Sequence, residues 1–216
     1  MAYTKTQAKR EEEQVFEAVI PKELANLKLP DVTLINDYKL RAKRKLWLDI
    51  DVDVDVLDLE RQILLWNMED EAYLPEERDP IWLYIWNQGG YMELSNSLID
   101  VIEASLTPIY TVNMGLCASA AADIFTSGKK RYMLKNARVM YHQGHGSLSG
   151  DAQKMADQMA DYNRQLEKAK EFLLAKTKIT SEDYEKYKYN DWWLTAEECL
   201  SYGVCDQIIE TLDDII

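Results

Sequence analysis

The run from Ala104 to Ala122 contains no charged residue, and this constrains the fold more than any other stretch, because such a run has to be buried. Pro108, Asn113 and Gly115 interrupt it, together with several hydroxyl side chains. We therefore interpret it as a strand and a helix in the core of a soluble protein, and not as a membrane span. Residues 109–114 are apolar and β-branched enough to form a buried strand, and Gly115 predicts a tight exit from it.

Ser119 lies in the small-residue turn that follows, within Gly115-Leu116-Cys117-Ala118-Ser119-Ala120-Ala121-Ala122. A serine at the first turn of a helix has its hydroxyl near unpaired backbone N–H groups and the positive end of the helix dipole. Developing negative charge is stabilised there, so Ser119 is a candidate nucleophile. The alternative is an ordinary helix N-cap, a position at which serine is common.

The chain has only two histidines, His142 and His145, so a histidine general base has to be one of them. We predict a strand over residues 132–141, which places His142 at its end, where a neutral imidazole facing a cleft accepts a hydroxyl proton. The alternative is a histidine that is merely hydrogen-bonded. His145 lies among glycines and is predicted to be a loop residue.

Asp191 is the best candidate for a carboxylate that orients the imidazole. Thr195 and Glu198 form an S/T-x-x-E capping box for a short helix that stops at Gly203, so Asp191 lies in the loop ahead of a well-defined helix start. Its alternative role is to form a turn or a cap. The chain order Ser, His, Asp matches none of the orders of chymotrypsin, subtilisin or the α/β-hydrolases, so those folds receive no support.

Four separated stretches resemble the proteolytic subunit of the Clp protease family, in the Clp/crotonase superfamily. They are residues 80–90, with Gly89-Gly90, residues 115–122, residues 136–143 and residues 191–206. Their order and spacing also agree, over roughly Lys45 to Ile209. The resemblance implies an α/β fold of repeated β-β-α units with a projecting handle helix. It covers a catalytic domain at 45–216 and leaves an N-terminal segment, 1–44, without a clear match.

The resemblance also implies a role for each site residue. Ser119 is the nucleophile, His142 the general base and then acid, and Asp191 the carboxylate that holds the imidazole. The backbone N–H groups of Gly90 and Ala120 form the oxyanion hole. The residue types suit this role, because glycine allows close approach of the scissile carbonyl and Ala120 lies at a helix N-terminus. Taken alone, the pair Gly89-Gly90 predicts only a turn. The resemblance implies no cofactor and no metal ion.

This chain departs from the family pattern beside the site. The family usually has Ser-Pro before the glycine pair, methionine after the serine and proline after His-Gln. Here these positions hold Asn87-Gln88, Ala120 and Gly144. We expect the changes to loosen the cleft and to alter the pocket for the P1 side chain, while no member of the triad is lost.

The activity implied is that of a serine endopeptidase subunit of a self-compartmentalising protease, which cleaves peptides or unfolded polypeptides. Two stacked heptameric rings, a tetradecamer of identical subunits, are expected to enclose the sites. A separate AAA+ unfoldase would consume ATP, because this chain has no G-x-x-x-x-G-K-[ST] phosphate loop. The unmatched segment 1–44 leaves docking of that unfoldase open.

Residues 151–178 show helical periodicity, with an apolar stripe through Met155, Met159, Tyr162, Leu166, Ala169 and Leu173. Such a stripe is usually ordinary core, but in the family the equivalent helix is a handle that packs against the opposing ring. The glycine-rich linker 144–150 is either flexible or able to extend beside a peptide as an added strand.

Three other functions stay open. A crotonase-type acyl-CoA enzyme shares the fold and the oxyanion geometry but has no use for Ser119, His142 and Asp191 together. A non-catalytic ring subunit, acting as scaffold or regulator, agrees with the altered flanks and the unmatched start. A phage-type maturation protease of the same superfamily is a variant of the main hypothesis.

Charge and cysteine content exclude some classes of partner. The net charge of −13, from 25 basic and 38 acidic residues, argues against general affinity for nucleic acid or anionic lipid. In the segment 49–55 aspartates alternate with apolar residues, which predicts one carboxylate face of an extended segment, leading into a helix at 57–68. We interpret that face as solvated, with a calcium or magnesium site as the alternative.

The three cysteines, Cys117, Cys199 and Cys205, have neither zinc-site nor disulfide spacing, and the chain does not begin with a secretory apolar core. Both features predict a reducing, cytoplasmic setting. Cys117 lies two residues from Ser119 and is therefore a rival nucleophile, although packing is the expected role.

Overall fold

The structure is a computed structural model that describes residues 32–216, of which residues 37–216 form one compact unit. Residues 1–31 of the expected N-terminal segment lie outside the described residues. The helices are α1 Val32–Arg41, α2 Val56–Glu69, α3 Met92–Ala104, α4 Ala120–Ser127, α5 Ala152–Lys176, α6 Ser181–Tyr187 and α7 Ala196–Ser201, with short 3-10 turns η1 Pro75–Glu77 and η2 Leu212–Asp214. The strands are β1 Lys45–Leu48, β2 Ile81–Asn87, β3 Ile109–Ala118, β4 Lys130–Leu134, β5 Arg138–Tyr141, β6 Trp192–Leu194 and β7 Gln207–Ile209.

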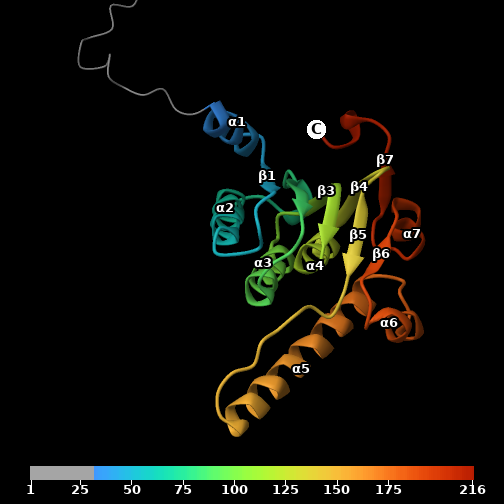
Figure 1. Cartoon of the computed structure of the whole chain (residues 1–216). Helices are drawn as coiled ribbons and strands as arrows, with labels where there is room; N and C mark the ends of the chain where they lie inside the picture. Colours follow the sequence, from blue (N-terminus) through green and yellow to red (C-terminus); the bar gives the residue numbers. More distant parts are fainter. Residues whose placement is uncertain (1–31) are drawn as a thin grey trace, which may run out of the picture. The chain divides into compact units, whose positions relative to one another are not determined.

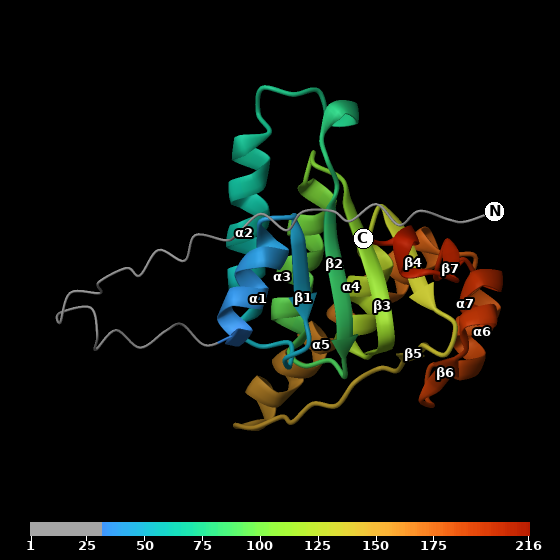
Figure 2. The ribbon, with the colours of Figure 1, turned by 90° about the horizontal axis from the view of Figure 1, so that it is seen from above.

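The described strands form one seven-stranded sheet (Figures 1 and 2). Five of them run parallel in the order β1-β2-β3-β4-β7, while β5 pairs parallel with β3 and antiparallel with β6. Consecutive parallel strands from β1 to β4 are joined through α2, α3 and α4, as parallel pairing requires. The predicted α/β fold is confirmed.

β3 changes its partner along its length, and this brings distant segments together. Residues 110–113 pair with β4, whereas residues 116–118 pair with β5. Gly115, at φ +154°, lies between the two stretches, and the amide of Asn113 spans the change by accepting from the Gly115 N–H at 2.9 Å and donating to the Arg138 carbonyl at 2.9 Å. The strand therefore continues beyond the predicted exit at Gly115 to Ala118.

The single strand predicted over 132–141 is wrong. β4 ends at Leu134, the chain turns at Lys135 and Asn136, and β5 begins at Arg138. Asparagine favours such a turn, and the two strands then pair with different stretches of β3. His142 still follows the end of a strand, because β5 ends at Tyr141.

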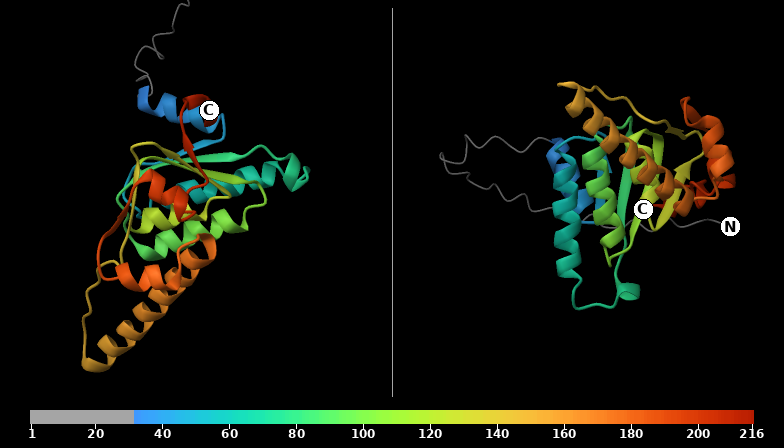
Figure 3. Two further views of the ribbon diagram at one scale, coloured as in Figure 1. Left: turned by 90° about the vertical axis from the view of Figure 1, so that its right-hand side faces the viewer. Right: turned by 90° about the horizontal axis from the view of Figure 1, so that it is seen from below.

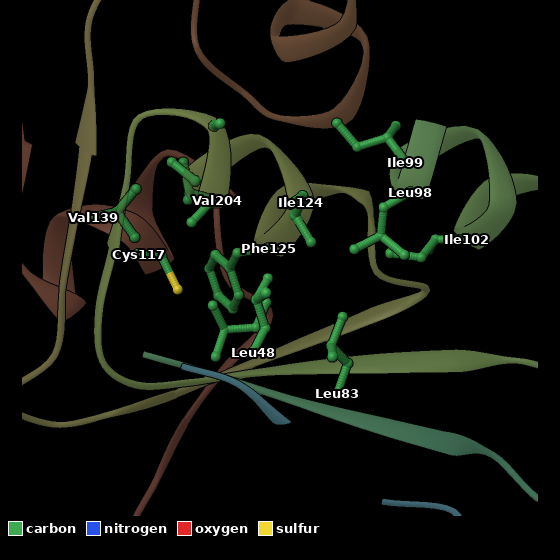
Figure 4. Packing of buried hydrophobic residues seen from close by; sticks show 14 of the residues in the cluster. Leu48, Leu83, Leu98, Ile99, Ile102, Cys117, Ile124, Phe125, Val139 and Val204 are labelled. Atoms are coloured by element: carbon green, nitrogen blue, oxygen red, sulfur yellow. The ribbon is translucent and has the colours of Figure 1, made fainter. Parts of the chain in front are cut away.

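The core lies between the sheet and the helices α2, α3 and α4 (Figures 1 and 4). Leu48 and Leu83 from the sheet, Leu98 from α3 and Phe125 from α4 are essentially inaccessible to solvent. Full burial of one such side chain contributes about 1.5 to 3 kcal/mol. The helix that carries the Ser119 turn is thus fixed against the sheet.

The sequence predicts one extended segment over 49–55, and this prediction is wrong for the end of the segment, where the chain turns. β1 ends at Leu48, Val52 makes one isolated bridge to Gly90, and the chain then turns into α2. The Asp53 carboxylate accepts from the Asp55 N–H at 3.0 Å, which is the local hydrogen bond by which aspartate favours a turn over a strand. The predicted helix over 57–68 is confirmed by α2.

α5 agrees with the helix predicted over 151–178, and it leaves the sheet and its covering helices as a projection (Figures 1 and 3). Asp151 caps it by accepting from the Lys154 N–H at 3.0 Å. Along the apolar stripe only Leu173 is buried, while Met155 and Met159 are exposed. Among residues 32–216 no helix is both long and apolar enough to cross a membrane.

Candidate active site

Ser119 occupies a strained position between β3 and α4. Its backbone has φ +55° and ψ −131°, which is costly for a residue with a side chain, and its N–H donates to the Met140 carbonyl at 2.8 Å. Although Ser119 stands at the N-cap position of α4, its hydroxyl makes no capping hydrogen bond. The hydroxyl is instead directed to another group, which disfavours the simple N-cap alternative.

His142 is the partner of that hydroxyl. Its Nε2 lies 2.7 Å from Ser119 Oγ, within hydrogen-bonding distance. The sheet produces this contact, because Ala118 pairs with Met140 and the residues just after each strand end therefore lie side by side. A nucleophile and a base at this separation can exchange a proton.

Asp191 lies on the other side of the imidazole. It immediately precedes β6, and the antiparallel pairing of Trp192 with Tyr141 sets it opposite His142. Asp191 Oδ1 is 3.6 Å from His142 Nδ1, which is longer than a hydrogen bond, and the Asp191 side chain is 61% exposed. The capping box predicted at Thr195 and Glu198 is confirmed and anchors the chain after β6.

The surroundings of His142 favour its neutral form. Burial lowers the pKa of His142 below 6.5, the negative charge of Asp191 acts in the opposite direction, and His145 lowers it further. The His145 ring lies edge-on to the His142 ring at 5.3 Å between centroids. At neutral pH the imidazole is therefore mostly unprotonated and able to accept a proton.

Gly89 and Gly90 form a turn directly against the serine. A Cβ atom at Gly89 would lie 2.7 Å from Ser119 Cβ, and one at Gly90 would lie 2.3 Å from the Val52 carbonyl oxygen, so only glycine fits at either position. Among residues 32–216 the backbone N–H groups of Gly90 and Ala120 donate to no other group. Two free donors thus belong to segments that touch beside the hydroxyl.

Asn87 braces this turn. Its side chain is buried, its Oδ1 accepts from the Gly89 N–H at 2.7 Å, and its Nδ2 donates to the Ile50 carbonyl. The Asn87 amide thus ties the turn to the segment after β1, while the expected loosening of the cleft by the Asn87-Gln88 departure stays a prediction. The sequence pattern marked Asn87 only as a departure.

Cys117 does not face the site. It is fully buried in the core (Figure 4), and burial raises the pKa of its thiol well above the usual range. A thiol that stays protonated is a poor nucleophile. The expected packing role is confirmed.

A pocket adjoins Ser119 and His142, and it contains a carboxylate that the sequence analysis missed. Its walls come from α4, β5, α5, α6 and β6, and Asp123 of α4 lines it together with Ser119. The spacing between Ser119 and Asp123 could have indicated it, because residues four apart lie on the same face of a helix. Within the described range, no group of three or more His, Cys, Asp or Glu side chains is placed to hold a metal ion, the segment 49–55 included.

The comparisons with known proteins agree in family. The sequence profile described as "Clp protease" matches residues 39–212. The chain is 31% identical over 159 residues to ATP-dependent Clp protease proteolytic subunit 2 of Bifidobacterium longum, covering 71% of this chain and 72% of that protein. It is 32% identical over 176 residues to the subunit of the same name of Tropheryma whipplei, covering 79% and 93%.

Among solved structures, the chain is similar to that of a ClpP1 mutant from Listeria monocytogenes. The TM-score is 0.70 at 26% sequence identity, and the match covers 82% of this chain and 98% of that one.

Proposed function

The chain belongs to the Clp protease family, and from this premise we propose that it is a serine endopeptidase subunit of a self-compartmentalising Clp-type protease. The observation that carries the proposal is the 2.7 Å contact between His142 Nε2 and the hydroxyl of Ser119, a residue at a strained turn whose hydroxyl caps nothing. A serine held in this way has the arrangement of an activated nucleophile.

In the proposed mechanism, His142 Nε2 accepts the Ser119 proton as Oγ attacks the peptide carbonyl. The Gly90 and Ala120 N–H groups stabilise the oxyanion, and His142 then returns the proton to the leaving amine. Water, deprotonated by His142, hydrolyses the acyl-enzyme and regenerates the hydroxyl. Asp191 favours the protonated imidazole by its charge. No step needs a cofactor or a metal ion.

The proposal includes assembly into two stacked heptameric rings. The exposed half of the α5 stripe, at Met155 and Met159, supports it, because these apolar side chains are available to pack against another subunit. A separate AAA+ unfoldase would supply unfolded polypeptide, in line with the "ATP-dependent" names of the relatives.

Fluorophosphonate labelling tests the proposal. The wild-type protein is expected to be labelled on Ser119, and Ser119→Ala to be unlabelled, while Cys117→Ala keeps the label and serves as the matched control. Size-exclusion chromatography establishes that each protein is assembled. An assembled wild type that takes no label would contradict the proposal and favour the non-catalytic ring subunit.

The acid side of the pH profile tests the environment of His142. Because burial favours the neutral imidazole, the rate constant for fluorophosphonate inactivation is expected to be high above the lowered pKa and to fall as pH drops through it, with a midpoint below 6.5. His145→Asn is expected to move the midpoint to higher pH, because His145 lowers the pKa of His142. A wild-type midpoint above 6.5 would refute this.

A further inference from the structure

We propose that the pocket beside Ser119, which we call the Asp123 pocket, receives a lysine or arginine side chain at P1, and that the Asp123 carboxylate selects it. The inference rests on the proposed function and names its substrate class. The pocket is lined by Ser119 and Asp123 of the α4 region, by His142, and by side chains from β5, α5, α6 and β6.

The position of Asp123 ties the pocket to the nucleophile. Asp123 follows Ser119 by four residues, so it lies about one helical turn along the same face of α4. Ser119, His142 and Asp123 all line one pocket. A substrate side chain that enters beside the attacked carbonyl therefore meets this carboxylate.

The Asp123 carboxylate has no partner of its own. Although it is mostly buried, no hydrogen bond or ion pair to it is formed by any group within residues 32–216, and burial raises the pKa of Asp123 to about 7. The one cation that lines the pocket, Lys188, is bound by Glu185. A partly buried carboxylate that has no protein partner is left to solvent, and a ligand cation that displaces this solvent would supply a charged partner.

The walls of the pocket fit the rest of a basic side chain. α5 contributes Leu166, Ala169 and Leu173, and the ring of Tyr187 stacks on that of Trp192 at 4.6 Å between centroids. The apolar side chains can pack against the methylene stem of lysine or arginine, and the aromatic rings can attract its cationic end. A wholly apolar P1 side chain would instead leave the carboxylate desolvated and unpaired, which disfavours it.

Ionisation of Asp123 is expected to make the preference depend on pH. The titratable groups that line the pocket with it are Tyr141, His142, Tyr184, Tyr187 and Lys188. Burial raises the pKa of Tyr141 and of Tyr184, so both stay neutral, Lys188 is paired with Glu185, and the protonation of His142 affects the hydrolysis of every substrate equally. The ratio of kcat/KM for two P1 residues therefore cancels the titration of His142 and reports on Asp123.

The experiment compares peptides that differ only at P1, with lysine or its uncharged near-isostere norleucine. At about pH 8 the wild type is expected to prefer lysine by on the order of tenfold to a hundredfold in kcat/KM, the range for a hydrogen bond to a charged group. The preference is expected to shrink at about pH 6, where the carboxyl is largely protonated. Asp123→Asn is expected to bring the ratio near one, while Asp100→Asn, which removes an exposed carboxylate from α3, leaves it unchanged.

Loss of folding does not obscure the result. A carboxyl whose pKa is raised by folding destabilises the native state above its unfolded pKa, so Asp123→Asn is expected to melt no lower than the wild type at about pH 8. The inference would be overturned if Ser119-dependent hydrolysis favoured norleucine, or if the preference for lysine survived in Asp123→Asn. Either result would leave the proposed function intact. If no peptide is hydrolysed in a Ser119-dependent way, the proposed function itself fails, and the inference with it.

Discussion

Replacement of His142 by alanine is expected to lower peptide hydrolysis by on the order of 10⁵- to 10⁶-fold, because it removes the base that lies 2.7 Å from Ser119 Oγ. Without it the hydroxyl keeps its proton, and the leaving amine loses the group that would return a proton to it. Fluorophosphonate labelling is expected to be lost as well, since it needs the same activated oxygen.

The double variant Ser119→Ala/His142→Ala makes this test sharper. If the two residues act as one unit, the double variant is expected to be no slower than either single variant, whereas independent contributions would multiply. His145→Ala at about pH 8 is the matched control, because His145 is the other histidine of the chain and contacts the His142 ring, while the hydrogen bond to Ser119 Oγ is made by His142. At that pH His142 is neutral in either protein, so the effect of His145 on its pKa does not change the rate. Single-variant losses that multiply in the double variant would contradict the shared role of Ser119 and His142.

The parts of the fold that the sequence predicted depend on local signals. Three signals each involve residues that are close together in the sequence: the uncharged run through Ala122, the capping box at Thr195 and the periodicity of α5. The structure confirms the elements that they predicted. For the segment 49–55, the local pattern gave a wrong prediction. Its alternation resembles a strand, but the turn preference of Asp53, with its hydrogen bond to the Asp55 N–H, outweighs it.

The site depends on pairing that no local signal encodes. His142 reaches Ser119 because β3 leaves β4 and takes β5 as its partner beyond Gly115, and Asp191 reaches His142 because β6 pairs with β5. From the sequence alone, the chemistry of the residue types and the resemblance to a family related these three residues, but neither revealed the strand pairing that brings them together. Asp123 was missed for a different reason, since a lone carboxylate on a helix is ordinarily exposed, and its burial arises from the packing of α5 and α6 around α4.

Asp191→Asn is expected to lower kcat by about 10²- to 10⁴-fold. A neutral amide cannot stabilise the imidazolium that forms as Ser119 attacks, and it can hold the imidazole in the wrong tautomer. The loss is expected to be smaller than in His142→Ala, because Asp191 is 61% exposed and 3.6 Å from Nδ1, so solvent weakens its effect. Because Asp191 raises the pKa of His142, the acid midpoint is also expected to move to lower pH in this variant.

Two measurements separate this role of Asp191 from a merely structural one. Loss of kcat together with the downward shift of the acid midpoint, in a protein that assembles and melts like the wild type, indicates an electrostatic effect on His142. Glu197→Gln is the matched control, since it removes an exposed carboxylate from the first turn of α7, close in sequence to Asp191, and is expected to change neither quantity. An Asp191→Asn variant with unchanged kcat and an unchanged midpoint would remove Asp191 from the site and leave Ser119 and His142 as a dyad.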